Sequence, residues 1–447
     1  MKRIRTLLNS VYIIPVSYSL FGLLLAFFVI YIDVRHIVEL DFLPSFLMTE
    51  GDLARSIFSS LVGALLTMTT VSFSTIMVVL TLYSAQFTPR ITRDFLERRA
   101  PLRVLGLFMA SFIFSIISLY ALGQMDGTWA MLSPFIGVVL AIGCLGAFAY
   151  FIYHVARSVQ INYIIDRIAA DITQSVKRSI TAIESTPNIK HHLQDDAPKC
   201  SEEPVLSVPI AEPGFVTSIA HEQLLEMAAE HDLMLYLKTR LGDLLEEEDI
   251  IVDVHTYASK SLTDPESLAE DIQSAFTCGE ERNFEQDVEF GITKLVEVAL
   301  RAISPGINDP NTANYCIMKL GPICRIIGRE LENIYYYDDE MVPRIHVQNI
   351  VFRRLLYQTY HQLRTYGQHD ISVVAALIDS ISDIAEGNHR VATHDLWQMA
   401  DYILHGLGPL APLDREFINQ KIRKLARLLS RNPDDLIIPE TKEEKPS

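Results

Sequence analysis

Four long apolar stretches occupy the first third of the chain, and the pattern changes after them. They cover residues 11–32, 57–82, 102–122 and 131–153. Apart from Arg103 at the start of the third, none contains Asp, Glu, Lys or Arg, and each reaches the roughly 20 residues that a helix needs to cross a bilayer. Because these stretches are apolar on every face, they predict helices and not the alternating strands of a barrel. The sequence therefore predicts a four-helix transmembrane domain over residues 1–154.

After the fourth span the apolar spacing becomes that of water-facing structure. Residues 155–185 keep helical spacing, which predicts that the fourth span continues as a helical stalk. Prolines in residues 186–204 predict a linker, and short apolar runs in residues 205–262 predict a small β-rich subdomain. Residues 263–431 predict an α-helical subdomain, with Asp264 and Asp309 each preceding a proline at a helix start. The proline-containing and glutamate-containing residues 432–447 predict a disordered tail.

The positions of basic residues in the loops predict the orientation. Lys2, Arg3 and Arg5 precede the first span, and five arginines lie in residues 90–103 after the second. The other two connections are mainly acidic, so both termini are predicted to be cytoplasmic. The predicted fold class is a multi-pass α-helical membrane domain of four spans followed by an α+β cytoplasmic domain. That second domain is expected to be mainly helical with a small β-rich subdomain.

Charge and motifs narrow the function classes. Residues 1–154 hold ten Lys and Arg against eight Asp and Glu, so of the chain's net charge of −17 the remainder carries −19. An acidic domain repels nucleic acid, so no nucleic-acid partner is expected. The chain has no Walker A loop, no Gly-x-Gly-x-x-Gly and no His-Glu-x-x-His, and its five cysteines form no Cys-x-x-Cys pair. We therefore expect no catalytic residues, no cofactor and no metal, and the chain is not predicted to be an enzyme.

Two pairs of segments carry a family resemblance. The first pair is Ser-Phe-Ser-Thr-Ile-Met-Val-Val-Leu at 72–80 and Ser-Ala-Gln-Phe-Thr-Pro-Arg at 84–90. The second is Gly-Glu-Glu-Arg-Asn-Phe-Glu-Gln-Asp at 279–287 and Ala-Leu-Arg-Ala-Ile-Ser-Pro-Gly-Ile-Asn-Asp-Pro-Asn-Thr-Ala at 299–313. Over nearly its whole length the chain resembles a bacterial family of predicted membrane proteins catalogued as domain of unknown function 2254. The resemblance implies four spans and an inner-membrane location, with no established activity.

One face of the second span carries small and hydroxyl-bearing residues. They are Ser60, Gly63, Thr67, Thr70, Ser74, Thr81 and Ser84, at spacings of three, four or seven. Such a stripe can pack against another helix, or it can line a watery path in a symmetric oligomer. The absence of charges from the interior of the four stretches disfavours a coupled transporter, which usually needs an ionisable residue within the membrane.

A second candidate site lies around the turn at residues 304–312. An interhelical turn with Asp309 as a cap explains most of this motif. Alternatively, the exposed helix start and nearby arginines form an anion pocket for a nucleotide or phosphate. The candidate ligand residues are Arg282, Asp287, Arg301, Ser304, Asn308 and Asp309.

These observations favour a homo-oligomeric inner-membrane protein with a channel-like or permeation role that its cytoplasmic domain regulates. The alternative is a non-transporting sensor or scaffold, whose cytoplasmic domain binds a small anionic ligand or a protein partner. The expected partners are the lipid bilayer, other copies of the chain and a small anionic ligand.

Overall fold

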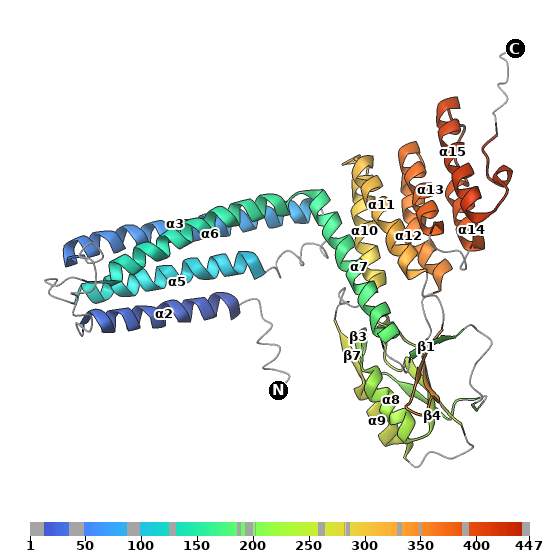
Figure 1. Ribbon diagram of the computed structural model, residues 1–447, viewed down its shortest axis with the longest axis horizontal. Coiled ribbons are helices and arrows are strands. Elements are labelled where there is room, and N and C mark those ends of the chain that lie inside the picture. The colour runs from blue at the N-terminus through green and yellow to red at the C-terminus, as the bar shows by residue number, and fades with distance from the viewer. Residues whose placement is uncertain are drawn as a thin grey trace. The chain divides into compact units, whose positions relative to one another are not determined.

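The computed structural model divides into two compact units, Met1–Tyr163 and Ile164–Ser447 (Figure 1). The structure describes residues 13–34, 49–86, 99–124, 131–185, 189–192, 200–201, 203–257, 264–280, 282, 287–328, 333–347, 351–386 and 393–439. The first unit contains four helices long and apolar enough to cross a membrane, which confirms the four predicted spans.

The four spans are helices α2, α3, α5 and α6. Their bounds are Ile13–Val34, Gly51–Gln86, Arg99–Leu122 and Ser133–Ser158. Helix α3 begins six residues before the predicted apolar stretch, because Asp52 and Arg55 extend it beyond its apolar part. Helix α5 is the central one: 44% of its most apolar window is buried, compared with 17% for each of the others. Accordingly α2, α3 and α6 all contact α5.

Two contacts between the spans hold these helices together: a close approach of α2 to α5, and a cap at the start of α6. A Cβ added at Gly22 of α2 would lie 2.3 Å from the carbonyl oxygen of Ala110 in α5, so only glycine allows this approach. At one end, the carboxylate of Asp33 accepts hydrogen bonds from the backbone N–H groups of Leu132 (3.0 Å) and Ser133 (3.2 Å). Asp33 therefore supplies the cap that α6 lacks in its own sequence.

The predicted continuous stalk is not formed. Helix α6 ends at Ser158, and a separate helix, α7 (Ile161–Ser185), begins after a break at Val159 and Gln160. The apolar residues that suggested a stalk are buried, and Ile172 lies where a Cβ on Gly291 would be 2.6 Å away. Helix α7 is therefore a packed part of the second unit.

Two sheets form the β-rich part of the second unit. The larger has the order β1-β8-β9-β4-β6-β2 and is antiparallel except between β4 and β9. Its strands are Ile189–His192, Asn333–Tyr337, Pro343–Val347, Leu233–Leu237, Ile250–Thr256 and Leu206–Pro209. The smaller sheet has the order β5-β3-β7, with strands Leu244–Leu245, Gly214–Ile219 and Phe276–Gly279.

Alternation within the strands separates an apolar from an aromatic face of the larger sheet. Leu233, Leu235 and Leu237 of β4 enter an apolar core, to which helices α8 (His221–Glu230) and α9 (Pro265–Ser274) also contribute. The intervening Met234 and Tyr236 belong to a second cluster with Tyr335 and Tyr337. The period of two along each strand produces this division.

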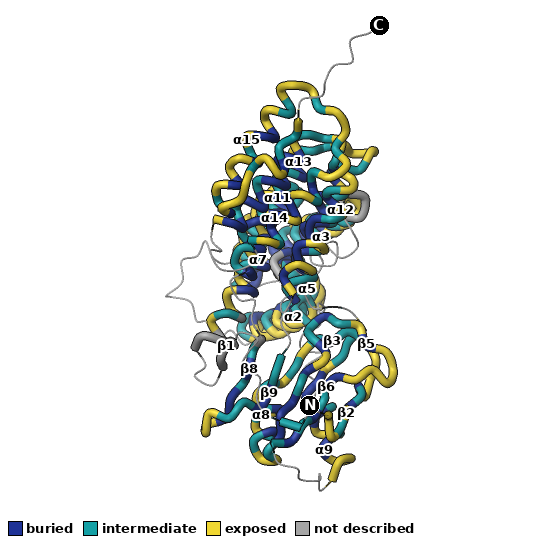
Figure 2. The backbone as a smooth tube through the Cα atoms, turned by 90° about the vertical axis from the view of Figure 1, so that its right-hand side faces the viewer, coloured by how far each residue is buried: buried dark blue, intermediate teal, exposed yellow. Residues whose placement is uncertain are grey.

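The remaining helices form a layered bundle, with most buried positions on their facing sides (Figures 1 and 2). They are α10 (Val288–Ala302), α11 (Pro310–Ile327), α12 (Phe352–Gly367), α13 (Ile371–Ala385), α14 (Thr393–Leu404) and α15 (Pro412–Leu429). The predicted caps are present: Asp264 accepts from the N–H of Ser267, and Asp309 from that of Thr312. The predicted mainly helical α+β character of this unit is confirmed.

The structure also differs from the predictions in the second unit. Strand β1 lies within the predicted linker, and β7, β8 and β9 lie where helices or no elements were expected. The predicted disordered tail is ordered over residues 432–439: a 3-10 helix, Pro433–Asp435, follows α15, and the side chain of Asn419 bonds the backbone of Ile438. Residues 440–447 lie outside the described part of the chain.

Candidate functional site

Helix α3 has two opposite faces. One is buried in the bundle and contains Phe58, Leu65, Ser72 and Val79, at an exact repeat of seven residues. Each of the hydroxyl-bearing residues Ser60, Thr67, Ser74 and Thr81 comes two positions later, which is about 200° around a helix. The predicted stripe therefore lies directly opposite the face that packs against the rest of the chain.

The stripe is exposed in the single chain. Ser60, Gly63, Thr67, Thr70, Ser74 and Thr81 are all exposed, and a Cβ added at Gly63 would meet nothing within 4 Å. The side chain of Ser84 lies outside the described residues. These six residues therefore do not pack against the other three spans, so packing of the stripe within the four-helix unit is excluded for them.

Most stripe hydroxyls are bonded to their own helix. Ser60 donates to the carbonyl oxygen of Ser56 at 3.0 Å and Thr67 to that of Gly63 at 2.9 Å. Thr70 and Thr81 donate to the carbonyls four residues before them, both at 2.9 Å. This bonding satisfies each hydroxyl hydrogen, and it leaves the oxygen lone pairs on the helix surface as acceptors.

A second set of hydroxyls, which sequence reasoning missed, lies inside the bundle. Ser111, Ser115 and Ser118 of α5 are each 1% exposed, as is Ser72 of α3. Ser111 is 3.1 Å from the sulfur of Cys144, whereas the hydroxyls of Ser72 and Ser118 have no hydrogen-bond partner among the residues that the structure describes. Their spacing of three and four in α5 was visible in the sequence as a second polar face.

The candidate anion pocket is not assembled as predicted. Arg282 donates to Asp287 through Nε (2.5 Å) and Nη2 (2.8 Å), and Asp287 also caps α10 through the N–H of Phe290. Asp287 is only 4% exposed, so Arg282 is already neutralised by a buried carboxylate. Gly242, at φ +87°, lies over the pair, where a Cβ would be 2.0 Å from the Asp287 carboxylate.

The other predicted ligand residues lie at the far end of α10. Asp287 and Arg301 are separated by about 21 Å along the helix, at 1.5 Å per residue. Around Arg301, the hydroxyl of Ser304 donates to the Arg301 carbonyl, and Asn308 adopts a left-handed φ of +52°. The joint pocket for Arg282 and Arg301 was wrong, because almost the whole of α10 lies between these two residues.

The α10–α11 turn is explained by capping. Asp309 accepts from both the N–H (3.1 Å) and the hydroxyl (2.6 Å) of Thr312. The Thr312 hydroxyl and backbone bonds to its carboxylate lower the pKa of Asp309. A carboxylate at this helix start occupies the position that an anion would take.

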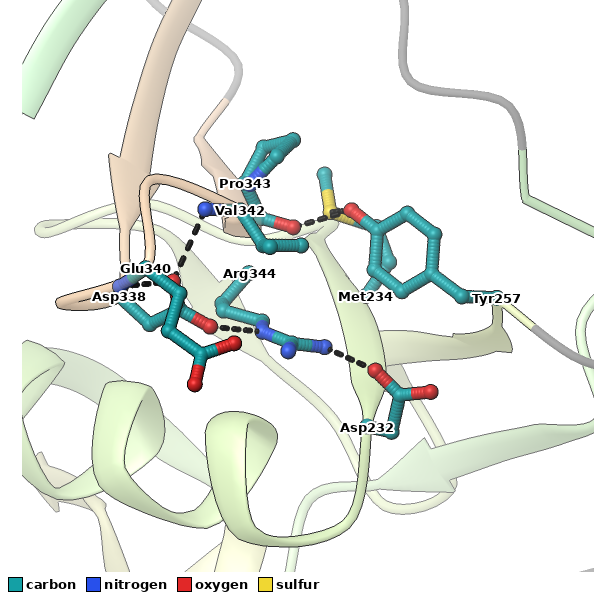
Figure 3. Close-up of polar contacts among 8 residues, drawn as sticks. All are labelled: Asp232, Met234, Tyr257, Asp338, Glu340, Val342, Pro343 and Arg344. Carbon is teal, nitrogen blue, oxygen red and sulfur yellow. Dashed lines mark hydrogen bonds and ion pairs between the residues drawn. The ribbon is translucent and has the colours of Figure 1, made fainter.

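A charged cluster around a buried arginine lies at the larger sheet (Figure 3). Arg344, 5% exposed, donates through Nε to Asp338 and through Nη1 to Asp232, both at 2.7 Å. Its guanidinium lies over the ring of Tyr257, whose hydroxyl donates to the carbonyl of Pro343. Burial raises the pKa of Asp338, but bonds from the Val342 N–H and Arg344 outweigh it, so the pKa lies below its usual range.

This cluster joins segments that are distant in sequence. Asp232 precedes β4, whereas Asp338 and Arg344 come from the β8–β9 hairpin. Sequence reasoning missed it because none of these residues forms a motif with its neighbours. Both carboxylates neutralise Arg344, so the cluster holds the sheet together and offers no free cation. Elsewhere in the described residues, no three His, Cys, Asp or Glu side chains are grouped to hold a metal ion.

Comparisons with known proteins agree with the membrane fold and describe no activity. A family model described as "Predicted membrane protein (DUF2254)" matches residues 8–383. Uncharacterized proteins of Mycobacterium bovis and Mycobacterium tuberculosis are each 26% identical to the chain over 356 residues, or 76% of it. The chain spans 64% of the length of these curated relatives. No solved structure matches it.

Proposed function

The chain belongs to the DUF2254 family of predicted membrane proteins, and from that premise we propose that it forms a homo-oligomer with a channel-like role. In this proposal the outward stripe of α3 faces the symmetry axis and lines a permeation path. The C-terminal unit, Ile164–Ser447, regulates opening. No catalytic step is part of the proposal.

The position of the stripe is the observation that supports this function. A helix facing only lipid on its outer side has no need of hydroxyls there, whereas α3 has five of them and a glycine opposite its buried face. Their free lone pairs are acceptors of the kind that line pores for water or cations. Rotational symmetry would bring the same stripe from each subunit to one axis.

We also propose that the spans lie in a bacterial inner membrane with both termini in the cytoplasm. The arginines in residues 90–103 and the basic residues before the first span support this orientation. Single cysteines placed in the first and second connections, in a background without the five native ones, would test it in whole cells. A membrane-impermeant thiol reagent is expected to label the first and not the second.

Single-channel recording tests the permeation path. The purified full-length protein in planar bilayers is expected to give discrete currents, which Thr70→Leu and Ser74→Leu reduce by narrowing the path. Thr75→Leu is the matched control, because Thr75 lies about 100° around α3 from Ser74 and its hydroxyl bonds the carbonyl of Val71. Currents unaffected by the stripe substitutions, or an absence of current from a protein shown to be folded, would overturn the proposal.

One observation favours a second candidate, a non-transporting sensor or scaffold. Four stripe hydroxyls are satisfied within α3, so the face could pack against another subunit without any water. In that case the C-terminal unit would bind a small anionic ligand or a protein partner. A silent but oligomeric protein, with stripe cysteines that crosslink between subunits, would favour this candidate.

A further inference from the structure

A groove of about 900 Å³ runs between α7 and α11 in the second unit. It opens to solvent, and both of its walls belong to Ile164–Ser447. Its volume is within the range of small-molecule sites in proteins. Neither the predicted ligand residues nor the α3 stripe contribute to it, so its function does not depend on whether the spans conduct.

The groove is cationic although the unit around it is acidic. Residues 164–447 hold 27 Lys and Arg against 47 Asp and Glu. The groove reverses this ratio, because Lys177, Arg178 and Lys319 line it together with a single carboxylate, Asp166. A local excess of positive charge on a strongly negative unit selects for an anionic ligand.

The charge is concentrated at one end. Lys319 is paired with Asp166 at 2.8 Å, and the hydroxyl of Tyr315 also donates to Asp166, so that end is neutral. Lys177 and Arg178 are exposed and form no ion pair with any residue that the structure describes. They lie about 17 Å along α7 from Asp166. An anionic group would therefore bind at the Lys177 end.

The part of the groove between the two ends, its floor, is lined mainly by aliphatic side chains. They are Ala169 and Ala170 of α7 and Pro322 and Ile323 of α11, and the polar Gln174 lies between the two alanines and Lys177 in the sequence of α7. The hydroxyl of Thr173, which also lines the groove, already donates to the carbonyl of Ala169 at 2.7 Å. None of the lining residues is aromatic. Proteins usually hold nucleotide bases by stacking on aromatic rings, so an alkyl chain suits this floor better than a base.

We propose that this groove binds a single-chain anionic lipid. The phosphate or carboxylate head lies on Lys177 and Arg178, and the alkyl chain lies along Ala169, Ala170, Pro322 and Ile323. Charge complementarity determines the direction in which the ligand lies, and the neutral Asp166–Lys319 end accepts the end of the chain.

Photolabelling tests the proposal on the full-length protein in nanodiscs of zwitterionic lipid. The probe is a 16-carbon fatty acid with a diazirine on its chain, and labelled peptides are identified by mass spectrometry. We expect saturable labelling of the peptides that contain Ala169, Ala170, Pro322 or Ile323. Labelling of the spans is expected in every variant, because the probe also enters the bilayer, and it serves as an internal standard.

Two variants and one control distinguish the contribution of the groove's charge to labelling from that of its shape. The double variant K177E/R178E should weaken groove labelling at least tenfold, and Ala170→Trp should weaken it by filling the groove without removing a charge. R353E/R354E is the matched control, because Arg353 and Arg354 are adjacent, exposed residues of α12 outside the groove. It should label like the wild type. Thermal unfolding of each variant establishes that it is folded.

Competition identifies which part of the ligand is recognised. Dodecyl phosphate is expected to displace the probe, whereas inorganic phosphate and dodecanol at the same concentration are not. Displacement by inorganic phosphate would show a simple anion site, and displacement by dodecanol would show that the cations are unused. Either result would overturn the proposal, as would unchanged groove labelling in K177E/R178E.

Discussion

The two units satisfy their polar groups in different ways. In the spans, the hydroxyls of Thr67 and Thr70 bond carbonyls only four residues away. In the second unit, Arg344 bonds Asp232, which is 112 residues away in sequence. Lipid offers no hydrogen-bonding partner, so a span bonds its backbone within the helix, and these outward hydroxyls bond their own helix too. In the second unit, charged pairs between distant segments define which strands and helices meet.

The two kinds of bonding have different costs when they are broken. Removing one member of a buried ion pair leaves the other charge unpaired in a poorly solvated site. Removing a hydroxyl bonded within its own helix leaves only a carbonyl that keeps its backbone partner.

The following predictions compare the costs of breaking these two kinds of bond, and the first three use one readout. Trp129 and Trp397 are the two tryptophans of the chain, so in a Trp129→Phe background the fluorescence of Trp397 in α14 reports unfolding of the second unit.

The largest effect is expected for Arg344→Met. This change leaves Asp338, 8% exposed, without its main countercharge, and it also releases Asp232. We expect a loss of about 3–5 kcal/mol in the free energy of unfolding. Chemical denaturation followed by Trp397 fluorescence measures it. Lys238→Met is the control, because Lys238 is half exposed in its pair with Asp253 and its loss should cost at most about 1 kcal/mol. Equal costs for the two would show that burial of an ion pair in the second unit does not determine the cost of breaking it.

A smaller loss is expected for Gly242→Ala. Gly242 has a φ of +87°, and an added Cβ would lie 2.0 Å from the Asp287 carboxylate. Strain and displacement of the Arg282–Asp287 pair should cost about 2–3 kcal/mol by the same denaturation measurement. Gly306→Ala is the control, because a Cβ there would meet nothing within 4 Å. If Gly242→Ala leaves the free energy of unfolding unchanged, the Arg282–Asp287 pair can shift without a loss of stability.

The sequence was a better guide to the first unit than to the second for the same physical reason. Four spans could be predicted because composition and length alone determine a membrane helix. In the second unit, local signals at Asp264 and Asp309 predicted helix starts correctly. They could not reveal that β4 pairs with β9 in parallel, or that Arg344 meets Asp232. Those facts depend on contacts between distant segments, for which the single sequence has no local pattern.

A pH-dependent loss in the second unit should come from His221. Its ring stacks on Tyr336 at 5.0 Å, and burial lowers the pKa of His221 to about 4. The unfolded chain takes up this proton at an ordinary pKa of about 6.5, so stability is full above that pH and falls as the pH drops towards 4. Between pH 7 and pH 5 the loss should be about 2 kcal/mol. His221→Phe keeps a stacked ring and should remove that part of the pH dependence. If the free energy of unfolding of this variant falls with pH as steeply as that of the wild type, the pH dependence does not come from His221.

The smallest effect is expected for Thr67→Val in α3. Valine keeps the shape of threonine and removes a hydroxyl that bonds only the carbonyl of Gly63. In a lone subunit this should change stability by less than about 0.5 kcal/mol. Denaturation in mixed micelles measures it, with Ser111→Ala as the control, since the Ser111 hydroxyl lies 3.1 Å from Cys144 on another helix. A loss above about 1 kcal/mol for Thr67→Val, with a smaller particle by light scattering, would contradict purely local bonding. Because the Thr67 side chain is exposed within one chain, such a loss would show that the stripe is held between subunits.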